Sequence, residues 1–178
     1  TQTATLSTGG RSVPAATNYS EVNEYNGTSW SAETAYPSAI NAAMGTGTSS
    51  AALVFGGSVP SAVDSTFGYN GTAWTAGGNL STGRYNGYPA TAGSQTAALL
   101  AGGSSPSVVA ITENYDGSAW ATGPSMANVG SSGAGAGTQS AALRVAGNTG
   151  SPTNPTNNVT EEFTGEIQTA TASTLTTS

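Results

Sequence analysis

Paired carboxylates are the residue type in this chain that could most directly do chemistry. Two Asp or Glu side chains on either side of a bound sugar can hydrolyse a glycosidic bond. The candidates are Glu21, Glu24, Asp64, Glu113, Glu161 and Glu162. They recur at the period of a repeat described below, which favours a structural role or a solvated strand edge over a glycosidase. A calcium site needs several converging oxygens, and no spacing of a known calcium loop is present.

Nucleophilic catalysis lacks its usual bases in this chain. The sequence has no histidine, cysteine or lysine, and its only basic residues are Arg11, Arg84 and Arg144. A serine nucleophile needs a base that activates it, so Ser-His-Asp, Cys-His and Ser-Lys chemistry is excluded. We therefore expect no catalytic residue, no metal site and no cofactor, and we predict that the protein is not an enzyme.

The charge balance limits the possible partners. Charged residues make up 7% of the chain and the net charge is −6, whereas an average globular chain is about 25% charged. Nucleic-acid binding and attachment to anionic lipid both need clustered Lys and Arg. No stretch approaches the roughly 18 apolar residues of a membrane-spanning helix. We expect neither nucleic-acid binding nor membrane insertion.

A hairpin motif recurs along the chain and suggests how these side chains are positioned. Its residues are Tyr25, Gly27 and Trp30, then Tyr69, Gly71 and Trp74, then Tyr115, Gly117 and Trp120, with a weaker fourth copy at 163–167. Asn-Gly or Asp-Gly between strand-forming residues predicts a hairpin with a type I′ turn. The copies begin at 25, 69, 115 and 163, so they are 44, 46 and 48 residues apart. A period of this size is typical of repeat arrays and propellers.

A second motif recurs in step with the hairpin. Short apolar runs end in glycine at 4–10, 51–57, 97–103 and 141–147, with the pairs Gly56-Gly57 and Gly102-Gly103 in the two central copies. Such a run predicts a buried strand, and the glycines permit a sharp exit from it. An Ala/Gly-rich strand is expected before each of the later runs, around 39–46, 86–93 and 129–137. One unit then has four antiparallel strands, which describes a propeller blade.

The repeats predict a single all-β domain over 1–178. Its units are expected at about 1–34, 35–77, 78–123 and 124–170, with 171–178 as a closing strand. The first unit begins at its second strand and lacks an opening one. If the tail 168–178 pairs beside residues 4–8, the ring closes with a blade shared by both termini, and closure removes open sheet edges. The alternative is a partial ring completed by other copies or by more of the same chain.

The order of the motifs resembles the kelch repeat: an apolar strand ending in Gly-Gly, Tyr-Asp/Asn-Gly about a dozen residues later, then Trp. Arg84 follows Trp74 as an arginine follows tryptophan in many kelch units. The resemblance covers nearly the whole chain and implies a β-propeller. The stretches Thr-Glu-Asn-Tyr-Asp-Gly-Ser-Ala-Trp at 112–120 and Gly-Ala-Gly-Thr-Gln-Ser-Ala-Ala-Leu at 135–143 also resemble, more weakly, kelch-like repeats in virion structural proteins of aquatic bacteriophages.

Two kinds of side chain allow more than one interpretation. The Tyr and Trp residues of the hairpins are expected to pack between blades, with a sugar-stacking surface as the alternative. Arg144 stands inside a strand where the other copies have Ser7, Val54 and Leu100. We expect it to pair with a glutamate or to line a central channel.

Loops on a rigid scaffold carry function more often than strands do. The candidate contacts are therefore the loops 58–61, 104–107 and 148–157, which contain Pro60, Pro106 and Asn154. The resemblance implies a non-enzymatic virion surface protein, a decoration or fibre-type component. Its expected partners are other virion proteins, further copies of itself and a cell-surface glycan. A secreted bacterial glycan-binding propeller is the alternative. Both place the chain on a virion surface or outside the cell.

Overall fold

A computed structural model describes residues 4–152 and 156–164 of the 178-residue chain. Every regular element among the described residues is a β-strand. The strands are β1 (Thr5–Arg11), β2 (Asn18–Tyr25), β3 (Trp30–Ala32), β4 (Met44–Thr48), β5 (Ala51–Phe55), β6 (Ser58–Val59), β7 (Ser61–Ala62), β8 (Thr66–Tyr69), β9 (Trp74–Ala76), β10 (Tyr88–Pro89), β11 (Ala98–Ala101), β12 (Ser104–Ser105), β13 (Ser107–Val108), β14 (Thr112–Tyr115), β15 (Trp120–Gly123), β16 (Ala134–Thr138), β17 (Ala141–Asn148) and β18 (Thr156–Thr164). In the described part of the chain, no helix is long and apolar enough to cross a membrane.

The strands form four antiparallel sheets in chain order. Sheet 1 is β1-β2-β3, sheet 2 is β4-β5-β8-β9, sheet 3 is β10-β11-β14-β15 and sheet 4 is β16-β17-β18. Small hairpins, β6-β7 and β12-β13, extend from sheets 2 and 3. Within the described residues sheet 1 has no opening strand, as predicted, and β1 lies at its edge. The fourth strand expected beyond Gly165 and the closing tail lie outside the described residues.

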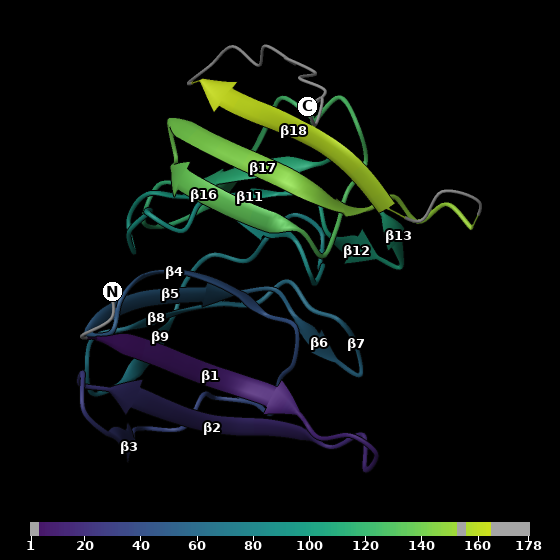
Figure 1. Cartoon of the computed structure of the whole chain (residues 1–178). Helices are drawn as coiled ribbons and strands as arrows, with labels where there is room; N and C mark the ends of the chain where they lie inside the picture. The colour runs from purple at the N-terminus through teal and green to yellow at the C-terminus, as the bar shows by residue number, and fades with distance from the viewer. Residues whose placement is uncertain (1–3, 153–155, 165–178) are drawn as a thin grey trace.

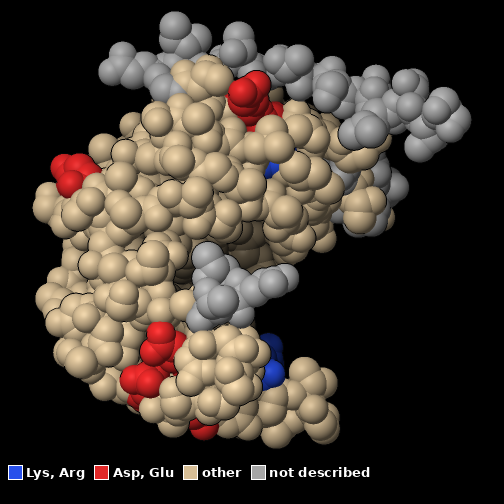
Figure 2. All heavy atoms as spheres, turned by 60° about the vertical axis from the view of Figure 1, so that its left-hand side comes forward, with Lys and Arg blue, Asp and Glu red and all other residues tan. Residues whose placement is uncertain are grey.

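The sheets stack side by side, from sheet 1 at the bottom of Figure 1 to sheet 4 at the top. Their innermost strands β4, β10 and β16 are neighbours. Figure 2 shows that the stack curves into an arc with an opening on one side. The fold is therefore an all-β, propeller-like arrangement in which each sheet packs on the next.

The inner strands are shorter than the Ala/Gly-rich stretches expected at 39–46, 86–93 and 129–137. They begin only after a residue with positive φ in each unit, namely Ala42 (53°), Asn86 (55°) and Ser132 (57°). The Ser132 amide donates to the Asn86 carbonyl oxygen at 2.7 Å, and the Asn86 amide donates to Ala42 at 3.2 Å. The residues before these strands thus link neighbouring sheets instead of extending their own.

The three hairpins occur where the sequence predicts them, but their turns are not type I′. Tyr25 pairs with Trp30, so four residues form the connection. Only the glycine has a positive φ, 97° at Gly27. The Asn26 side chain accepts hydrogen bonds from the amides of Thr28 and Ser29 at 2.9 and 3.0 Å. Asn70 and Asp116 do the same in the other copies. Because the side chain accepts these amides, the turn forms with a single residue at positive φ instead of the two that type I′ requires.

The Gly-Gly pairs end the buried strands as expected. Gly102 and Gly103 have φ values of 59° and 105°. A side chain at Gly102 would collide with the backbone oxygen of Gly130 in the following loop. The Gly103 amide donates to that same oxygen at 2.8 Å. The glycines therefore allow one sheet to hydrogen-bond to the chain that enters the next.

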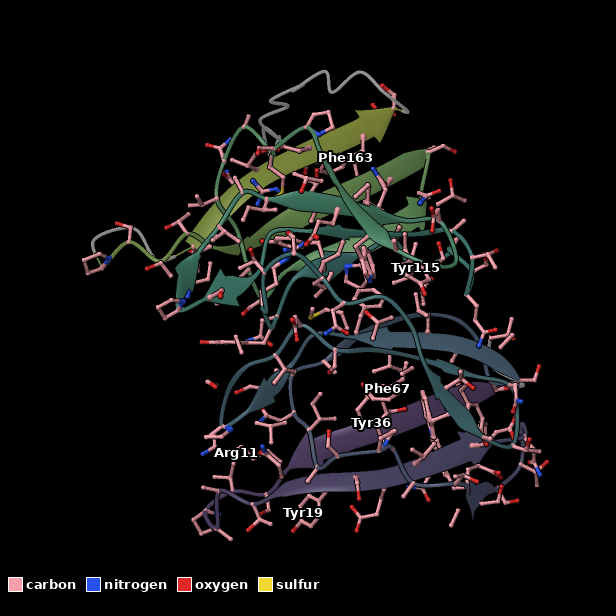
Figure 3. All side chains as sticks on the ribbon, turned by 180° about the vertical axis from the view of Figure 1, so that it is seen from behind. Arg11, Tyr19, Tyr36, Phe67, Tyr115 and Phe163 are labelled. Carbon is pink, nitrogen blue, oxygen red and sulfur yellow. The ribbon has the colours of Figure 1, made fainter. Side chains whose placement is uncertain are left out.

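Apolar cores lie between consecutive sheets. Between sheets 1 and 2, Tyr36 packs edge-on against Phe67 with ring centroids 5.3 Å apart, and Figure 3 shows the two rings close together there. Leu53 and Phe55 of sheet 2 pack against Ala98 and Leu100 of sheet 3. The remaining core, between sheets 3 and 4, contains Leu99, Ala101, Ala142 and Phe163.

Candidate functional site

The repeated carboxylates Glu113 and Glu161 are buried and each pairs with an arginine. Glu113 on β14 lies 2.5 Å from the Arg84 guanidinium, and both side chains are fully buried. Its other oxygen accepts a hydrogen bond from the Ser81 amide at 2.7 Å. Burial lowers the pKa of Arg84, and Glu113 opposes that shift. This glutamate therefore neutralises a buried cation and anchors the loop before β10.

Glu161 on β18 has the same role in sheet 4. It accepts the Arg144 guanidinium at 2.9 Å and the backbone amides of Ala127 and Asn128, each at 3.0 Å. Burial alone would raise the pKa of Glu161, but hydrogen bonds from Arg144 and Asn128 outweigh burial and lower it. The expectation that Arg144 pairs with a glutamate is confirmed, and the side chain is buried instead of lining a channel.

The two arginines reach equivalent glutamates from different places in the chain. Arg84 comes from the loop before β10, where the corresponding residue in the next unit is Gly130. Arg144 comes from β17, where the corresponding residue in sheet 3 is Leu100. A side chain at Gly130 would collide with the Arg144 guanidinium. The repeat thus keeps the ion pair while changing the position that supplies its cation.

The Arg84–Glu113 pair was not predicted from the sequence. The sequence contained one signal for it: the third and fourth units each combine an arginine with a glutamate at the same place in the hairpin motif. Among the other candidate carboxylates, Glu21, Asp64 and Glu162 are exposed and Glu24 is half-buried. Within the described residues, no three acidic or other metal-binding side chains converge on a possible metal site.

Two of the three tryptophans pack between sheets. Trp74 lies 5.0 Å from the Tyr36 ring, and its indole nitrogen donates to the Thr34 carbonyl oxygen at 2.9 Å. Trp120 lies 4.8 Å from the Phe55 ring and donates to the Thr66 hydroxyl at 2.9 Å. Each tryptophan thus contacts the preceding part of the chain, which confirms the packing interpretation for these two residues.

For Trp30 the packing expectation is wrong. Its side chain is 55% exposed, although its ring centroid lies 5.2 Å from that of Tyr25, as in the other hairpins. The reason is its place in the fold. Trp30 belongs to sheet 1, whereas Trp74 packs on the connection after sheet 1 and Trp120 packs on sheet 2. The motif is the same, and only the neighbour differs.

The predicted contact loops lie on one side of the molecule. The hairpins β6-β7 and β12-β13 project from the right side of Figure 1, where the β1-β2 and β17-β18 connections also lie. We call this surface the loop face, defined by residues 12–17, 58–62, 104–108 and 148–152. Pro60 and Pro106 are exposed there, as are Pro14 and Pro152, which were not singled out from the sequence. Val13 is 90% exposed. Asn154 lies outside the described residues.

A groove of about 510 Å³ lies between β1 and the inner part of sheet 2. Its walls include Thr5 and Thr8 of sheet 1 and Thr46 and Thr48 of β4. The Thr46 hydroxyl donates to the Ala90 carbonyl oxygen at 2.8 Å, so it serves the contact between sheets 2 and 3. The groove adjoins the edge of β1. In sheets 2 and 3 the inner strands β4 and β10 occupy the equivalent edge of β5 and β11.

The chain matches no protein-family model and no curated protein sequence. Among solved structures, that of YjhT is similar, with a TM-score of 0.69 at 13% sequence identity. The similarity covers 83% of this chain and 50% of the YjhT chain. It concerns the fold, and this chain spans about half the length of that protein.

Proposed function

We propose that the protein is a non-enzymatic structural component of a virion surface, of the decoration or fibre type. It acts by assembly with other virion proteins or further copies, and through contact with a host surface or glycan. The observation that carries the proposal is the loop face, where four equivalent connections stand side by side and each presents an exposed proline.

The internal chemistry of the chain supports a structural role. Glu113, Glu161, Arg84 and Arg144 are engaged in buried pairs, and Trp74 and Trp120 are engaged between sheets. Proline fixes φ and removes a backbone donor, so the loop tips are stiff. A stiff row of loops with little charge suits contact with a repetitive surface, because little conformational entropy is lost on binding.

We propose further that the four sheets are blades of a kelch-like propeller. The glycine exits, the Tyr–Trp hairpins and the buried glutamates Glu113 and Glu161 recur in register, and this recurrence supports the assignment. Pairing of the C-terminal strand with β1 is one way in which such a ring closes, and this pairing concerns residues outside the described part of the chain.

The test is to locate the protein in its source culture. Antibodies raised against peptides 58–62 and 104–108 should label the outside of intact particles purified on a density gradient. The chain should sediment with the other particle proteins. Recovery of the chain only as a free protein that binds glycans would contradict the virion proposal and would favour the secreted glycan-binding module.

A further inference from the structure

The two ends of the arc present the two halves of an interface that the molecule already forms internally. At one end, Trp30 of sheet 1 is exposed. At the other end, sheet 4 exposes Leu143 (38%) and Val145 (39%) on β17. We call the side of sheet 4 that carries Leu143, Val145 and Thr160 the receiving face.

The internal interface shows what a tryptophan of this motif contacts. Trp120 of sheet 3 packs against Phe55 of β5 and donates its indole N–H to the hydroxyl of Thr66 on β8. Phe55 and Thr66 are directly paired across their two strands. An aromatic residue paired with a threonine therefore forms the receptor for this indole, whereas the indole of Trp74 donates to the Thr34 carbonyl oxygen.

Sheet 4 repeats this receptor with no described strand in front of it. Val145 on β17 corresponds to Phe55, and Thr160 on β18 corresponds to Thr66. Val145 and Thr160 are again directly paired across their strands. Leu143 corresponds to Leu99 of sheet 3, which is only 5% exposed because sheet 4 packs against it. Sheet 4 thus keeps the leucine and the threonine that sheets 2 and 3 turn toward the next sheet. It differs from them in the exposed Glu162, which is paired with Leu143.

We propose that copies of this chain associate head to tail, with Trp30 of one copy packing against Val145 and Thr160 of the next. The indole N–H of Trp30 then donates to the Thr160 hydroxyl, as that of Trp120 does to Thr66. The contact is heterologous, because the two copies contribute different surfaces, and such contacts form closed rings or open chains.

A second copy fits these surfaces because one chain carries both halves of the contact. The opening of the arc in Figure 2 leaves the two ends of the stack apart. The sequence at the start of sheet 1 also agrees with a contact to a preceding sheet. Gln95 and Gln139 each stand two residues before the alanine that opens their apolar run, and Gln2 stands at the same place before Ala4. Gln95 and Gln139 donate to backbone oxygens of the preceding sheet. Gln2 itself lies outside the described residues.

The experiment is sedimentation velocity on the full chain over a range of micromolar concentrations, with the single variants Trp30→Ala and Val145→Glu. The unmodified chain should associate, and each variant should weaken association at least about tenfold, since tryptophans are common interface hot spots. Val129→Glu is the matched control, because it places the same charge on an equally exposed valine (39%) in the connection between sheets 3 and 4, outside the loop face and the proposed contact. It should associate like the unmodified chain.

Mixing the two variants makes the test specific. The Trp30→Ala chain keeps an intact receiving face, and the Val145→Glu chain keeps an intact Trp30. A mixture should therefore form a 1:1 heterodimer at concentrations where each variant alone is monomeric. Circular dichroism establishes that both variants are folded. A monomeric unmodified chain, unchanged association in both variants, or no heterodimer would overturn the proposal. The inference goes beyond the virion proposal, since either can fail while the other holds.

Discussion

At the scale of single residues, the two buried ion pairs dominate the electrostatics of this sparsely charged chain. The chain has three basic residues, and two of them, Arg84 and Arg144, are fully buried. Removing a charge from water is costly, and a partner with good geometry recovers that cost only when hydrogen bonds are satisfied as well. Each buried carboxylate therefore depends on its arginine, because without that cation its charge would remain buried and unpaired.

Replacing Arg144 by leucine tests this dependence. Leucine is the corresponding residue in sheet 3, so its shape suits the strand, but Glu161 loses its cation. We expect Arg144→Leu to lower the free energy of unfolding by about 3–5 kcal/mol, as for other broken buried pairs. The double variant Arg144→Leu/Glu161→Gln should recover at least half of this loss in urea titrations.

Arg11 provides the matched control, because it is an exposed arginine at the end of β1. Arg11→Leu should leave the urea midpoint nearly unchanged. Equal losses for Arg11→Leu and Arg144→Leu would show that the burial of the pair does not matter.

The lowered pKa of Glu161 predicts an acid-sensitive fold. A carboxyl whose pKa is lower in the folded state stabilises the fold above its unfolded pKa of about 4.3, and this stabilisation disappears as pH falls through the folded value. Thermal unfolding should therefore show a declining midpoint as the pH falls below that range. In Glu161→Gln the decline should be shallower, and parallel curves would contradict the assignment.

Ala146 occupies the strand-exit position that is glycine in the other three units. Its φ is 55°, against 59° at Gly102. A left-handed conformation costs a non-glycine residue roughly 1–2 kcal/mol, and glycine loses part of that gain through its freer unfolded chain. Ala146→Gly should raise the free energy of unfolding slightly, by up to about 1 kcal/mol. Gly102→Ala should lower it, because the added methyl would collide with Gly130. Urea titration measures both.

At the scale of the elements, the hairpin motif matters because of what it packs against. Trp74 and Trp120 insert their rings between sheets, and Trp30 carries the same motif on an open surface. Because the local geometry is shared, the three hairpins form alike. Their contributions to stability differ because they have different neighbours.

Two alanine variants compare these contributions directly. Trp120→Ala removes a ring that contacts Phe55 and a hydrogen bond to Thr66, and it should cost about 3–5 kcal/mol of unfolding free energy. Trp30→Ala should change the stability of the single chain very little, as exposed substitutions usually do. Both are measured by urea unfolding at a concentration where the chain is monomeric. Similar losses would contradict the open position of Trp30.

Local sequence predicts the elements well where one short segment decides the outcome. The Tyr–Trp hairpins and the glycine exits follow from turn chemistry within a few residues. The Arg84–Glu113 pair was beyond such reasoning, since its members lie on separate elements and meet only when sheet 3 forms. The exposure of Trp30 was equally unpredictable, because its motif is the same as that of the two packed tryptophans.

At the scale of the whole molecule, the chain is a row of sheets in which each packs on its neighbours. Such repeats gain stability from interfaces between consecutive units, and terminal units commonly carry polar outer faces. Here Thr5 and Ser7 give sheet 1 a partly polar outer side, whereas the receiving face exposes the apolar Leu143 and Val145 beside Glu162. The arc is therefore suited to being extended, which agrees with a function in assembly.

The mass and copy number of the native particle that contains this chain test the account most directly. Native mass spectrometry or direct imaging of purified particles would give both. We predict many symmetrically placed copies, in contact with one another or with other structural proteins and with the loop face directed outward. A chain that occurs in its source only as a free, closed monomer would contradict the account.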